Sequence, residues 1–488
     1  MTGRLYGVGL GPGDPELITV KAARLIGAAD VVAFHAARHG RSVARGLAEP
    51  YLRAGQIEEL LVYPVTTETT DHPGGYQGAI DEFYESAAER LATHLDAGRD
   101  VVVLAEGDPL FYGSYMHMHK RLAHRYPTEV VPGVTSVSGA AAAAGRPLVE
   151  RDEVLTVLPG TLPADQLAER LVATDSAAVL KLGRTFSEVR AAFERAGVLD
   201  RALYVERATT DRQRVLPLAD VDPSTVPYFS LALLPSPLSD ARPRPDSMDG
   251  AAPHAGEVVV VGLGPGSRAW TTPEAADALA AADALVGYGP YLDRVEAARA
   301  AHAFELARSG RRVAVVSSGD PGVFAMASAV LEVAERPEFR DVPVRVVPGL
   351  TAAQAVAARV GAPLGHDFCV LSLSDVLKPW DVVLDRLRHA AAADLVIALY
   401  NPRSRHRPHQ LGEAQQLLLE VRAPETVVVV GHDVGGSAEE ITVTTLRDLD
   451  PEDVDMRCLV LVGSSQTRLG PTGSVYTPRT YPAATRVP

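Results

Sequence analysis

Val8-Gly9-Leu10-Gly11-Pro12-Gly13 lies near the start of the chain and returns as Val261-Gly262-Leu263-Gly264-Pro265-Gly266 just past its middle. Each copy follows a short apolar run and precedes an alanine-rich helical pattern, a context that predicts a strand, a tight turn and a helix. Glycine at such a turn lets the backbone adopt positive φ and approach a ligand closely, and proline stiffens it. The sequence therefore predicts two domains, each with a tight turn after its first strand.

The spacing of these glycines disfavours a dinucleotide-binding fingerprint. That pattern reads G-x-G-x-x-G, whereas Asp14 and Ser267 occupy the place of its third glycine. An acidic residue should also end the second strand about twenty residues later, but Asp30 precedes the apolar run Val31–Phe34. A nicotinamide or flavin site is therefore not expected at either turn.

Two further motifs recur in the same order in both halves. Gly107-Asp108-Pro109 returns as Gly319-Asp320-Pro321, and Val130-Val131-Pro132-Gly133 returns as Val346-Val347-Pro348-Gly349. A threonine follows the last motif in each half, at Thr135 and Thr351. A repeat of this length predicts a duplicated domain rather than a solenoid.

The first half also contains an insertion. Gly262 follows Gly9 by 253 residues, whereas Gly319 follows Gly107 by 212, so about 41 extra residues lie between the first two motifs of the first half. Insertions between shared elements usually lie on the surface and often carry specificity.

Composition narrows the class of protein. With 488 residues, 47% hydrophobic and 22% charged, the chain can bury the cores of two or more globular domains. Cys369 and Cys458 are its two cysteines, which excludes a disulfide framework and a cysteine-based zinc or cluster site. We expect a soluble cytoplasmic protein, because we find neither a signal peptide nor the roughly 20 apolar residues of a membrane span. The net charge of −14 disfavours general nucleic-acid binding.

Continuous apolar runs predict parallel sheets buried on both faces. The clearest is Asp100–Ala105, which leads straight into the Gly-Asp-Pro motif. Ligands of open α/β sheets bind at the carboxyl ends of the strands. Both glycine-containing motifs of a half should therefore line one ligand-binding opening at that edge of the sheet, which we call the mouth of that half. Residues 15–29 predict a helix with Asp14 as its N-cap and Pro15 in its first turn.

A second α/β unit opens near Leu155, and the second half follows the same plan. We therefore predict an α/β protein of two tandem units, each made of two α/β lobes with a cofactor cleft between them. The predicted boundaries are a first domain at 1–234, a proline- and serine-rich linker at 235–256, a second domain at 257–470 and a flexible tail at 471–488.

The three motifs together resemble those of the tetrapyrrole methylases, which use S-adenosylmethionine. The first half, with YPVTTETTDHPGGY, GDPLFYGSYMHMHKRL and VLTVLPGTLP, is similar to precorrin-2 C20-methyltransferases. The second half, with VGYGPYLDRV, SSGDPGVFAMA, GHDFCVLSLSD and ALYNPRSR, is similar to precorrin-3B C17-methyltransferases, which also contract the macrocycle. The resemblance covers nearly the whole chain and implies one S-adenosylmethionine per half.

The resemblance also implies which residues hold the cofactor. In the first half they are Pro12, Glu106, Gly107, Asp108, Phe111, Thr135, Ser136, Leu182 and Ala208. In the second half they are Pro265, Ser318, Gly319, Asp320, Val323, Thr351, Ala352 and Asn401, with Val434 as a further candidate. The sequence departs from its relatives around Ala208 and Val434, where the usual Gly-Thr pair is missing. For Asp108 and Asp320 a turn-capping role competes with cofactor binding.

Methyl transfer requires little covalent chemistry from a protein, because the sulfonium already makes the methyl group electrophilic. The enzyme must align that group with a nucleophilic carbon about 3 Å away and exclude water. A precorrin carries many carboxylates, for which arginine is the preferred bidentate partner. The candidate partners are Arg38 and Arg41 in the insertion, near His39 and Arg45, and Arg403 and Arg405, near His406, Arg407 and His409. A solvated basic loop is the alternative at each position.

Candidate acids and bases come from the same stretches. Loss of a proton after C20 methylation points to Glu106, His117 or His119, and ring contraction points to His366, Asp375 or His432. His117 and His119 are two residues apart and do not share one helix face. No metal pair is therefore expected.

Several functions remain open at this point. The leading hypothesis is methylation of precorrin-2 at C20 and of precorrin-3B at C17. The alternatives are the cobalt-bound versions of these steps, a methylase of another substrate such as RNA ribose or modified histidine, and one half serving as a non-catalytic binding module. The chain could form a homodimer or pair its own two halves.

Overall fold

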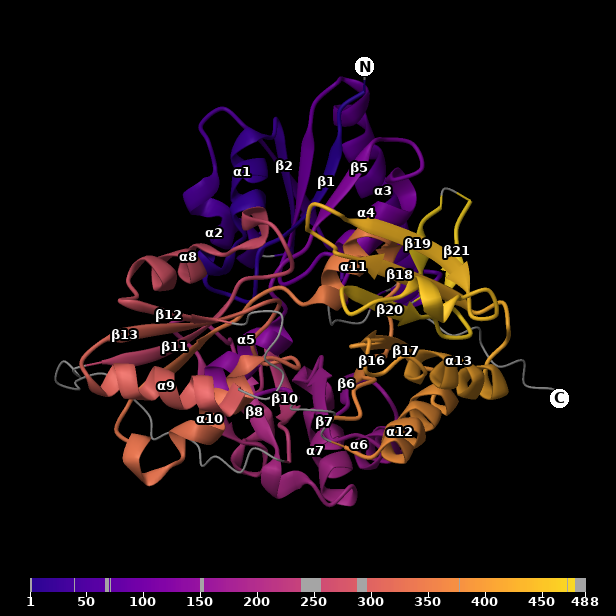
Figure 1. Cartoon of the computed structure of the whole chain (residues 1–488). Coiled ribbons are helices and arrows are strands. Elements are labelled where there is room, and N and C mark those ends of the chain that lie inside the picture. The colour runs from indigo at the N-terminus through magenta and orange to yellow at the C-terminus, as the bar shows by residue number, and fades with distance from the viewer. Residues whose placement is uncertain are drawn as a thin grey trace.

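The computed structural model describes residues 2–38, 40–65, 70, 72–149, 153–237, 256–287, 296–376, 378–471 and 473–478. Each half contains two α/β lobes, as predicted, and the four lobes lie around a common centre (Figure 1). Most of the linker and residues 288–295, part of one half-specific stretch, lie outside the described residues.

The first lobe of the first half is a five-stranded parallel sheet in the order β3-β2-β4-β1-β5. Its strands are β1 (Leu5–Gly9), β2 (Val31–Ala36), β3 (Ile57–Val62), β4 (Val101–Ala105) and β5 (Thr128–Val131). Alternate residues of β2 explain why the run is apolar throughout. Val32 and Phe34 pack on one face with α1 (Val20–Ala28) and α2 (Val43–Ala48), and Val31 and Ala33 pack on the other with α3 (Gly75–Asp96) and α4 (Tyr115–Leu122).

The predicted helix over residues 15–29 is wrong at its start. Pro15–Leu17 form a 3-10 turn, and Asp14 caps this turn by accepting from the N–H group of Glu16. The α-helix begins only at Val20, where the Thr19 side chain accepts from the N–H group of Ala22. The proline favours helical φ but cannot decide between one turn and three.

The insertion of the first half adds a strand to its sheet. β3 extends this sheet beyond β2. The corresponding sheet of the second half has four strands in the order β12-β13-β11-β14. These are β11 (Glu257–Gly262), β12 (Ala284–Gly287), β13 (Arg312–Ser317) and β14 (Val344–Val347), with α8 (Pro273–Ala280), α9 (Glu296–Arg308) and α10 (Met326–Ala334) against them.

The second lobes of both halves form one continuous ten-stranded sheet. The first half contributes β6 (Leu155–Pro159), β7 (Ser176–Leu180), β10 (Ser230–Leu234), β8 (Leu203–Glu206) and β9 (Arg214–Pro217). The second half contributes β16 (Phe368–Ser372), β17 (Val396–Tyr400), β20 (Cys458–Val462), β18 (Val427–His432) and β19 (Glu440–Thr445) in the same spatial order. β6 and β16 pair antiparallel, with Val157 opposite Phe368, so the halves are related by an approximate twofold axis.

The junction between the halves is a shared apolar core with charged links beside it. Leu155 and Val157 pack in the same buried cluster as Phe368 and Val370. Arg170 of α6 (Ala164–Val172) pairs with Asp367 of the other half. At the equivalent position Arg386 of α12 (Trp380–Ala392) pairs with Asp175 at 2.5 Å. The two halves thus pair with each other within the chain.

The prediction of a flexible tail from residue 471 is wrong for residues 473–478. Val475 and Tyr476 form β22, which pairs with β15 (Gly361–Ala362) and β21 (Arg468–Leu469). Val475 is buried, and the ammonium of Lys120 on α4 lies 5.4 Å from the centre of the Tyr476 ring. Val475 packs in the core shared by the halves, and Tyr476 packs against the core of the first half. The proline- and glycine-rich sequence around these two residues does not indicate this packing.

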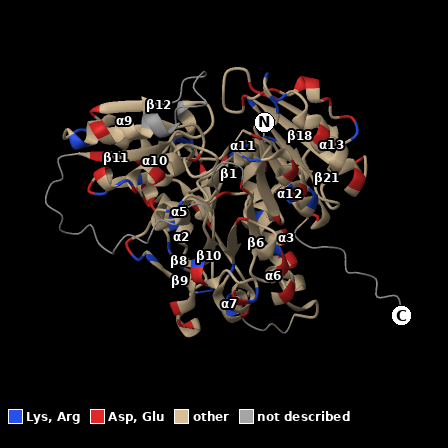
Figure 2. Ribbon diagram, turned by 60° about the horizontal axis from the view of Figure 1, so that its bottom comes forward, with Lys and Arg blue, Asp and Glu red and all other residues tan. Residues whose placement is uncertain are grey.

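Charged side chains of both signs are interspersed on the outer helices α9 and α12, whereas those of α13 (Gln410–Val421) are acidic (Figure 2). No described helix combines the length and apolarity needed to cross a membrane.

Candidate active sites

The glycine motifs meet at the carboxyl ends of the strands in both halves. Gly107 donates its N–H group to the Gly11 carbonyl at 2.8 Å, and Gly319 donates to the Gly264 carbonyl at 3.1 Å. The third motif closes against the second, because a Cβ atom on Gly133 would lie 2.1 Å from the Gly107 carbonyl oxygen. Only glycine permits this approach, and the predicted single mouth is confirmed for each half.

Asp108 and Asp320 hold these turns together. The carboxyl group of Asp108 accepts from the N–H groups of Leu110 at 2.9 Å and Gly133 at 3.1 Å. Asp320 accepts from the N–H groups of Gly322 at 2.9 Å and Gly349 at 3.1 Å. Burial raises the pKa of each aspartate to about 6, although the N–H groups oppose that shift. This geometry is the turn-capping alternative, so a cofactor is better matched to the neighbouring backbone than to these carboxyl groups.

The two lobes of each half touch at the first glycine turn. Asp14 donates its N–H group to the Thr209 hydroxyl at 3.1 Å, and Ser267 donates its N–H group to the Gly435 carbonyl at 2.8 Å. Ser267 therefore contacts the second lobe through its backbone N–H group, as Asp14 does, although its side chain differs. Thr209 directly follows Ala208, and Gly435 directly follows Val434.

The predicted cofactor residues Pro12 and Ala208 therefore lie at one junction. A Cβ atom on Gly13 would lie 2.9 Å from the Ala208 carbonyl oxygen. In the second half Gly266, which follows Pro265, packs equally closely on Gly435. Leu182 differs, because its side chain is buried in the core of the second lobe and only its backbone is left to face a ligand.

Backbone strain recurs at matching positions of the two mouths. Tyr112 and Phe324 have φ of 55° and 50°, and Lys181 and Asn401 have 61° and 49°. Each lies just beyond a Gly-Asp-Pro motif or the carboxyl end of a second-lobe strand. Such conformations cost about 1–3 kcal/mol for a non-glycine residue and cluster at functional sites. Their occurrence at matching positions of both halves makes the two mouths the candidate functional sites.

A helix N-terminus faces each mouth. Thr135 caps α5 (Ser136–Ala144) by accepting from the N–H group of Ser138, and Thr351 caps α11 (Ala352–Val360) by accepting from that of Gln354, both at 3.2 Å. The first N–H groups of a helix lack partners within it and favour polar or anionic groups. Ser136 and Ala352, the first residues of these helices, are therefore well placed for the predicted role.

Glu106 distinguishes the first mouth. More than a third of its surface is accessible, yet protein atoms surround its carboxyl group, a combination expected of a side chain in a recess. This desolvation raises the pKa of Glu106 to about 7, opposed by a hydrogen bond from the N–H group of Ala44. Ser318 takes this position in the second half, so the titratable acid belongs to the first half alone.

The two histidines of α4 have different surroundings. The His117 ring stacks on Tyr84 with centroids 4.0 Å apart. His119 is half-buried with its Nδ1 3.3 Å from the Tyr115 hydroxyl, and burial lowers its pKa to about 4. His119 is therefore a weaker base than an ordinary histidine, and His117 is the better candidate of the two.

His366 lies away from the mouth of its own half. It precedes β16, and its Nδ1 is 3.5 Å from Asp367, the partner of Arg170 in the first half. Burial lowers the pKa of His366, with Arg170 and Lys181 adding to this effect. Asp375 follows the carboxyl end of β16 and accepts from the Gln410 amide at 2.8 Å.

The candidate arginines differ in how much of their surface is exposed. Arg405 and Arg41 are exposed, as is Arg38, whose Nε donates to the Pro64 carbonyl at 2.5 Å. Arg403 pairs with Glu452. Arg407, which the basic loop also contains, is buried and donates to the carbonyls of Leu373 and Asn401, both at 3.0 Å, so it stabilises the fold. His39 lies outside the described residues.

The sequence did not predict the aromatic cluster that surrounds His35 and Tyr63 in the first half. The His35 ring stacks on Tyr63 at 5.3 Å, and Tyr63 bonds to the Ser114 hydroxyl. Burial lowers the pKa of His35 to about 4, and its Nε2 has no hydrogen-bond partner among the described residues. Tyr228 and Phe229, from the second lobe, remain exposed, and Tyr228 is close enough to act on the charge of Tyr63. Tyr63 begins a half-specific stretch, which was the available signal.

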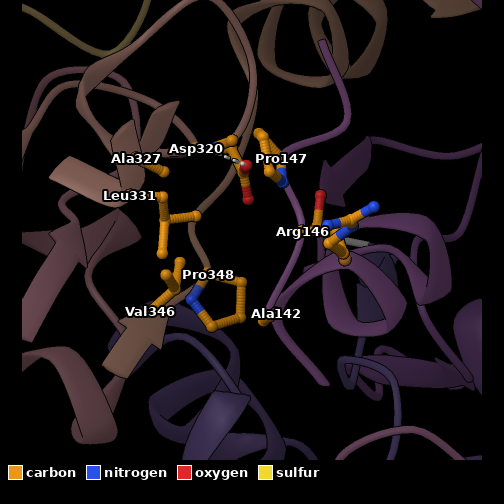
Figure 3. Close-up of a pocket in the computed structure, with 11 residues that line it drawn as sticks. Ala142, Arg146, Pro147, Asp320, Ala327, Leu331, Val346 and Pro348 are labelled. Atoms are coloured by element: carbon orange, nitrogen blue, oxygen red, sulfur yellow. Dashed lines mark hydrogen bonds between the residues drawn. The ribbon is translucent and has the colours of Figure 1, made fainter. Parts of the chain in front are cut away.

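Two small cavities lie between the halves. One lies beside Asp320; Figure 3 shows Ala142, Arg146 and Pro147 of the first half facing Leu331 and Pro348 of the second. The other is lined by Thr135 and Phe111 from one half and by Thr351 and Val323 from the other. No group of three or more histidine, cysteine or acidic side chains suited to a metal occurs within the described part of the chain.

Comparison with known proteins agrees with this architecture. Residues 4–222 and 257–450 match the family described as Tetrapyrrole (Corrin/Porphyrin) Methylases. The "Cobalamin biosynthesis protein CobIJ" of Mycobacterium bovis is 59% identical over 506 residues, covering 99% of this chain and 97% of that protein. The first half is similar to the "Precorrin-2 C(20)-methyltransferase" of Sinorhizobium sp, at 51% identity over 48% of the chain and 95% of that enzyme. The second half is similar to the "Precorrin-3B C(17)-methyltransferase" of Sinorhizobium sp, at 48% identity over 47% of the chain and 99% of that enzyme.

Proposed function

This chain belongs to the tetrapyrrole methylases, and we propose that it methylates two cobalamin precursors with S-adenosylmethionine. The first half methylates C20 of precorrin-2, and the second methylates C17 of precorrin-3B and contracts the ring. The observation that carries this assignment is that each half matches a different methyltransferase while one relative matches the whole chain at 59% identity.

The two mouths fit one S-adenosylmethionine each. Three turns converge so closely that a Cβ atom on Gly133 or Gly349 would lie within 2.4 Å of a facing carbonyl oxygen, which is typical of backbone shaped around a ligand. The N-termini of α5 and α11 supply N–H groups at the same place. When bound, the cofactor supplies an electrophilic methyl group, and the protein aligns it with the substrate carbon and excludes water.

In the first half, Glu106 acts as the general base that removes the C20 proton after methylation. A base works best when its pKa is near the working pH, and burial brings Glu106 to about 7. More than a third of the surface of Glu106 is exposed, which leaves a path by which a substrate in the recess can reach this residue. The N–H group of Ala44 fixes its orientation.

Aromatic side chains of both lobes hold the flat macrocycle in the first half. Tyr63 lies on the first lobe, and Tyr228 and Phe229 lie on the second with 67% and 42% of their surfaces exposed. Exposed aromatic rings offer large apolar area at low entropic cost. Arg38 and Arg41 pair with peripheral carboxylates.

In the second half, Asp375 is the candidate acid–base group for ring contraction, because it follows the carboxyl end of β16. Arg405, and Arg403 after release from Glu452, pair with substrate carboxylates at the same edge. Arginine suits this task since its fork matches a carboxylate bidentately.

The direct test is mass spectrometry of products from each substrate offered separately with S-adenosylmethionine. Gain of one methyl by precorrin-2 and, separately, of one methyl with ring contraction by precorrin-3B is expected. Methylation only of the cobalt-bound forms would transfer the assignment to the cobalt-dependent route. No methylation of either form would contradict the proposal.

A further inference from the structure

Two side chains cross between the halves at matching positions. Gln354 is the third residue of α11 in the second half, and its Nε2 donates to the Gly133 carbonyl of the first half at 2.8 Å. The same amide lies close enough to the carboxyl group of Asp108 to favour its ionised form, which opposes the rise of its pKa on burial. Ser138 is the third residue of α5 in the first half, lines the same cavity as Asp320 of the second half and opposes the rise in pKa of that carboxyl group in the same way. Each helix therefore supports the Gly-Asp-Pro turn of the other half.

The Gln354 amide uses its two ends for two different halves. Its Oε1 accepts from the N–H group of Thr351 at 3.1 Å and from the Thr351 hydroxyl at 2.9 Å, which closes a capping box on its own helix. Its Nε2 faces the Gly133 carbonyl and the Asp108 carboxyl group. Both of these are acceptors when Asp108 is ionised, so only a donor can join them.

A displacement of Gly133 would spread through the first mouth. Its N–H group is held by Asp108 at 3.1 Å. Its Cα side faces Gly9 and Gly107 so closely that a Cβ atom would lie 2.9 Å and 2.1 Å from their backbones. Close-packed backbone transmits strain rather than absorbing it. The hydrogen bond from Gln354 to the Gly133 carbonyl therefore affects the turns at Gly9, Gly107 and Gly133 together.

We propose that Gln354 is a positioning residue for the first methylation site, supplied by the second half, and that Ser138 serves the second site reciprocally. The inference rests on the proposed function, because it concerns the cofactor sites assigned there. Its consequence is that the two halves are obligate partners. C20 methylation requires a side chain from the half whose own chemistry is at C17.

The test uses Gln354→Glu in the full chain. Glutamate keeps the acceptor that closes the capping box but loses the donor and places a carboxylate opposite two acceptors. We expect the KM for S-adenosylmethionine in the C20 reaction to rise about tenfold or more, since the Gly133 carbonyl loses its donor and a carboxylate is placed against it. The C17 reaction should stay within about twofold, a change too small to reflect a lost hydrogen bond. Binding of S-adenosylhomocysteine by calorimetry should show one weakened site and one unchanged site.

A pH series separates this role from a general structural defect. As the pH falls, the carboxyl group introduced by Gln354→Glu becomes protonated and regains a donor, so affinity at the weakened site should recover. The matched variant Ser138→Ala should weaken the second site and spare the first. If Gln354→Glu does not fold, the Ser138→Ala variant alone tests the proposal.

Three results would overturn the inference. The first is an equal loss of affinity at both sites in one variant. The second is a loss only at the site of the half that carries the substitution, and the third is no change at any site in the two variants. Absence of S-adenosylhomocysteine binding by the unsubstituted protein would instead overturn the proposed function, and this inference with it. Two normal sites in the unsubstituted protein and in both variants would overturn only the inference.

Discussion

In both halves a buried aspartate accepts from two backbone N–H groups and ties the Gly-Asp-Pro turn to the Val-Pro-Gly turn. Around these turns the halves diverge. The first mouth carries Glu106 where the second carries Ser318, and its sheet has the additional edge strand β3. The shared part is what two S-adenosylmethionine sites would need, and the divergent part lies where two substrates would differ.

The largest expected effect comes from removing the shared aspartate on one side only. Asp108→Ala leaves the N–H groups of Leu110 and Gly133 buried without their acceptor, at about 1–3 kcal/mol each. We expect C20 methylation to fall about a thousandfold or more and C17 methylation to stay nearly unchanged, since two such losses sum to a large effect. Product mass spectrometry with each substrate measures both.

Asp320→Ala is the matched variant and should show the reverse pattern. Loss of both activities in either variant would mean that the halves do not hold separate sites.

A smaller effect should mark the divergent acid. Glu106→Gln removes the proposed base and should lower C20 turnover about a hundredfold, with no effect on C17 turnover. Because the pKa of Glu106 is raised to about 7, its ionised, basic form is lost as the pH falls below 7. The C20 rate of the unsubstituted protein should therefore rise with pH through about 7, and the variant should lack this inflection.

The second half has Ser318 at this position, so its pH profile is the internal control. A C17 profile with the same inflection, or a C20 profile unchanged in the variant, would show that Glu106 is not the base.

The ion pairs that join the halves should differ in strength. Arg170→Ala leaves Asp367, whose side chain is 3% exposed, without its guanidinium partner, and should cost about 3 kcal/mol of unfolding free energy. Arg386→Ala leaves Asp175, at 16% exposure, and should cost about 1 kcal/mol because water reaches it more easily. Urea denaturation of the two variants measures the difference. Equal costs would contradict the asymmetry.

The smallest effect concerns the tail. Ending the chain after residue 470 removes Val475, which is buried in the core shared by the two halves, and should lower the unfolding free energy by about 2 kcal/mol. Ending it after residue 478, which keeps β22, is the control. Thermal unfolding of both truncated chains compares them. No difference between them would show that β22 contributes nothing to stability.

Local patterns predicted much of this molecule. The glycine turns, the Gly-Asp-Pro motif and the capping threonines are set by residues close in sequence, and the first glycine turn lies against the second lobe, with Gly13 beside Ala208. The predictions failed where distant segments decide the outcome. The position of His366, the buried tail at Val475 and the crossing of Gln354 all depend on how one half packs on the other, which no local spacing encodes.

The most direct measurement is the position of the new methyl group after the full chain acts on precorrin-2 with ¹³C-methyl-labelled S-adenosylmethionine. The account predicts a single labelled methyl at C20 in the unsubstituted protein and in Asp320→Ala, and none in Asp108→Ala. A label at another carbon, or a label that depends on Asp320 rather than Asp108, would contradict the assignment of the two halves.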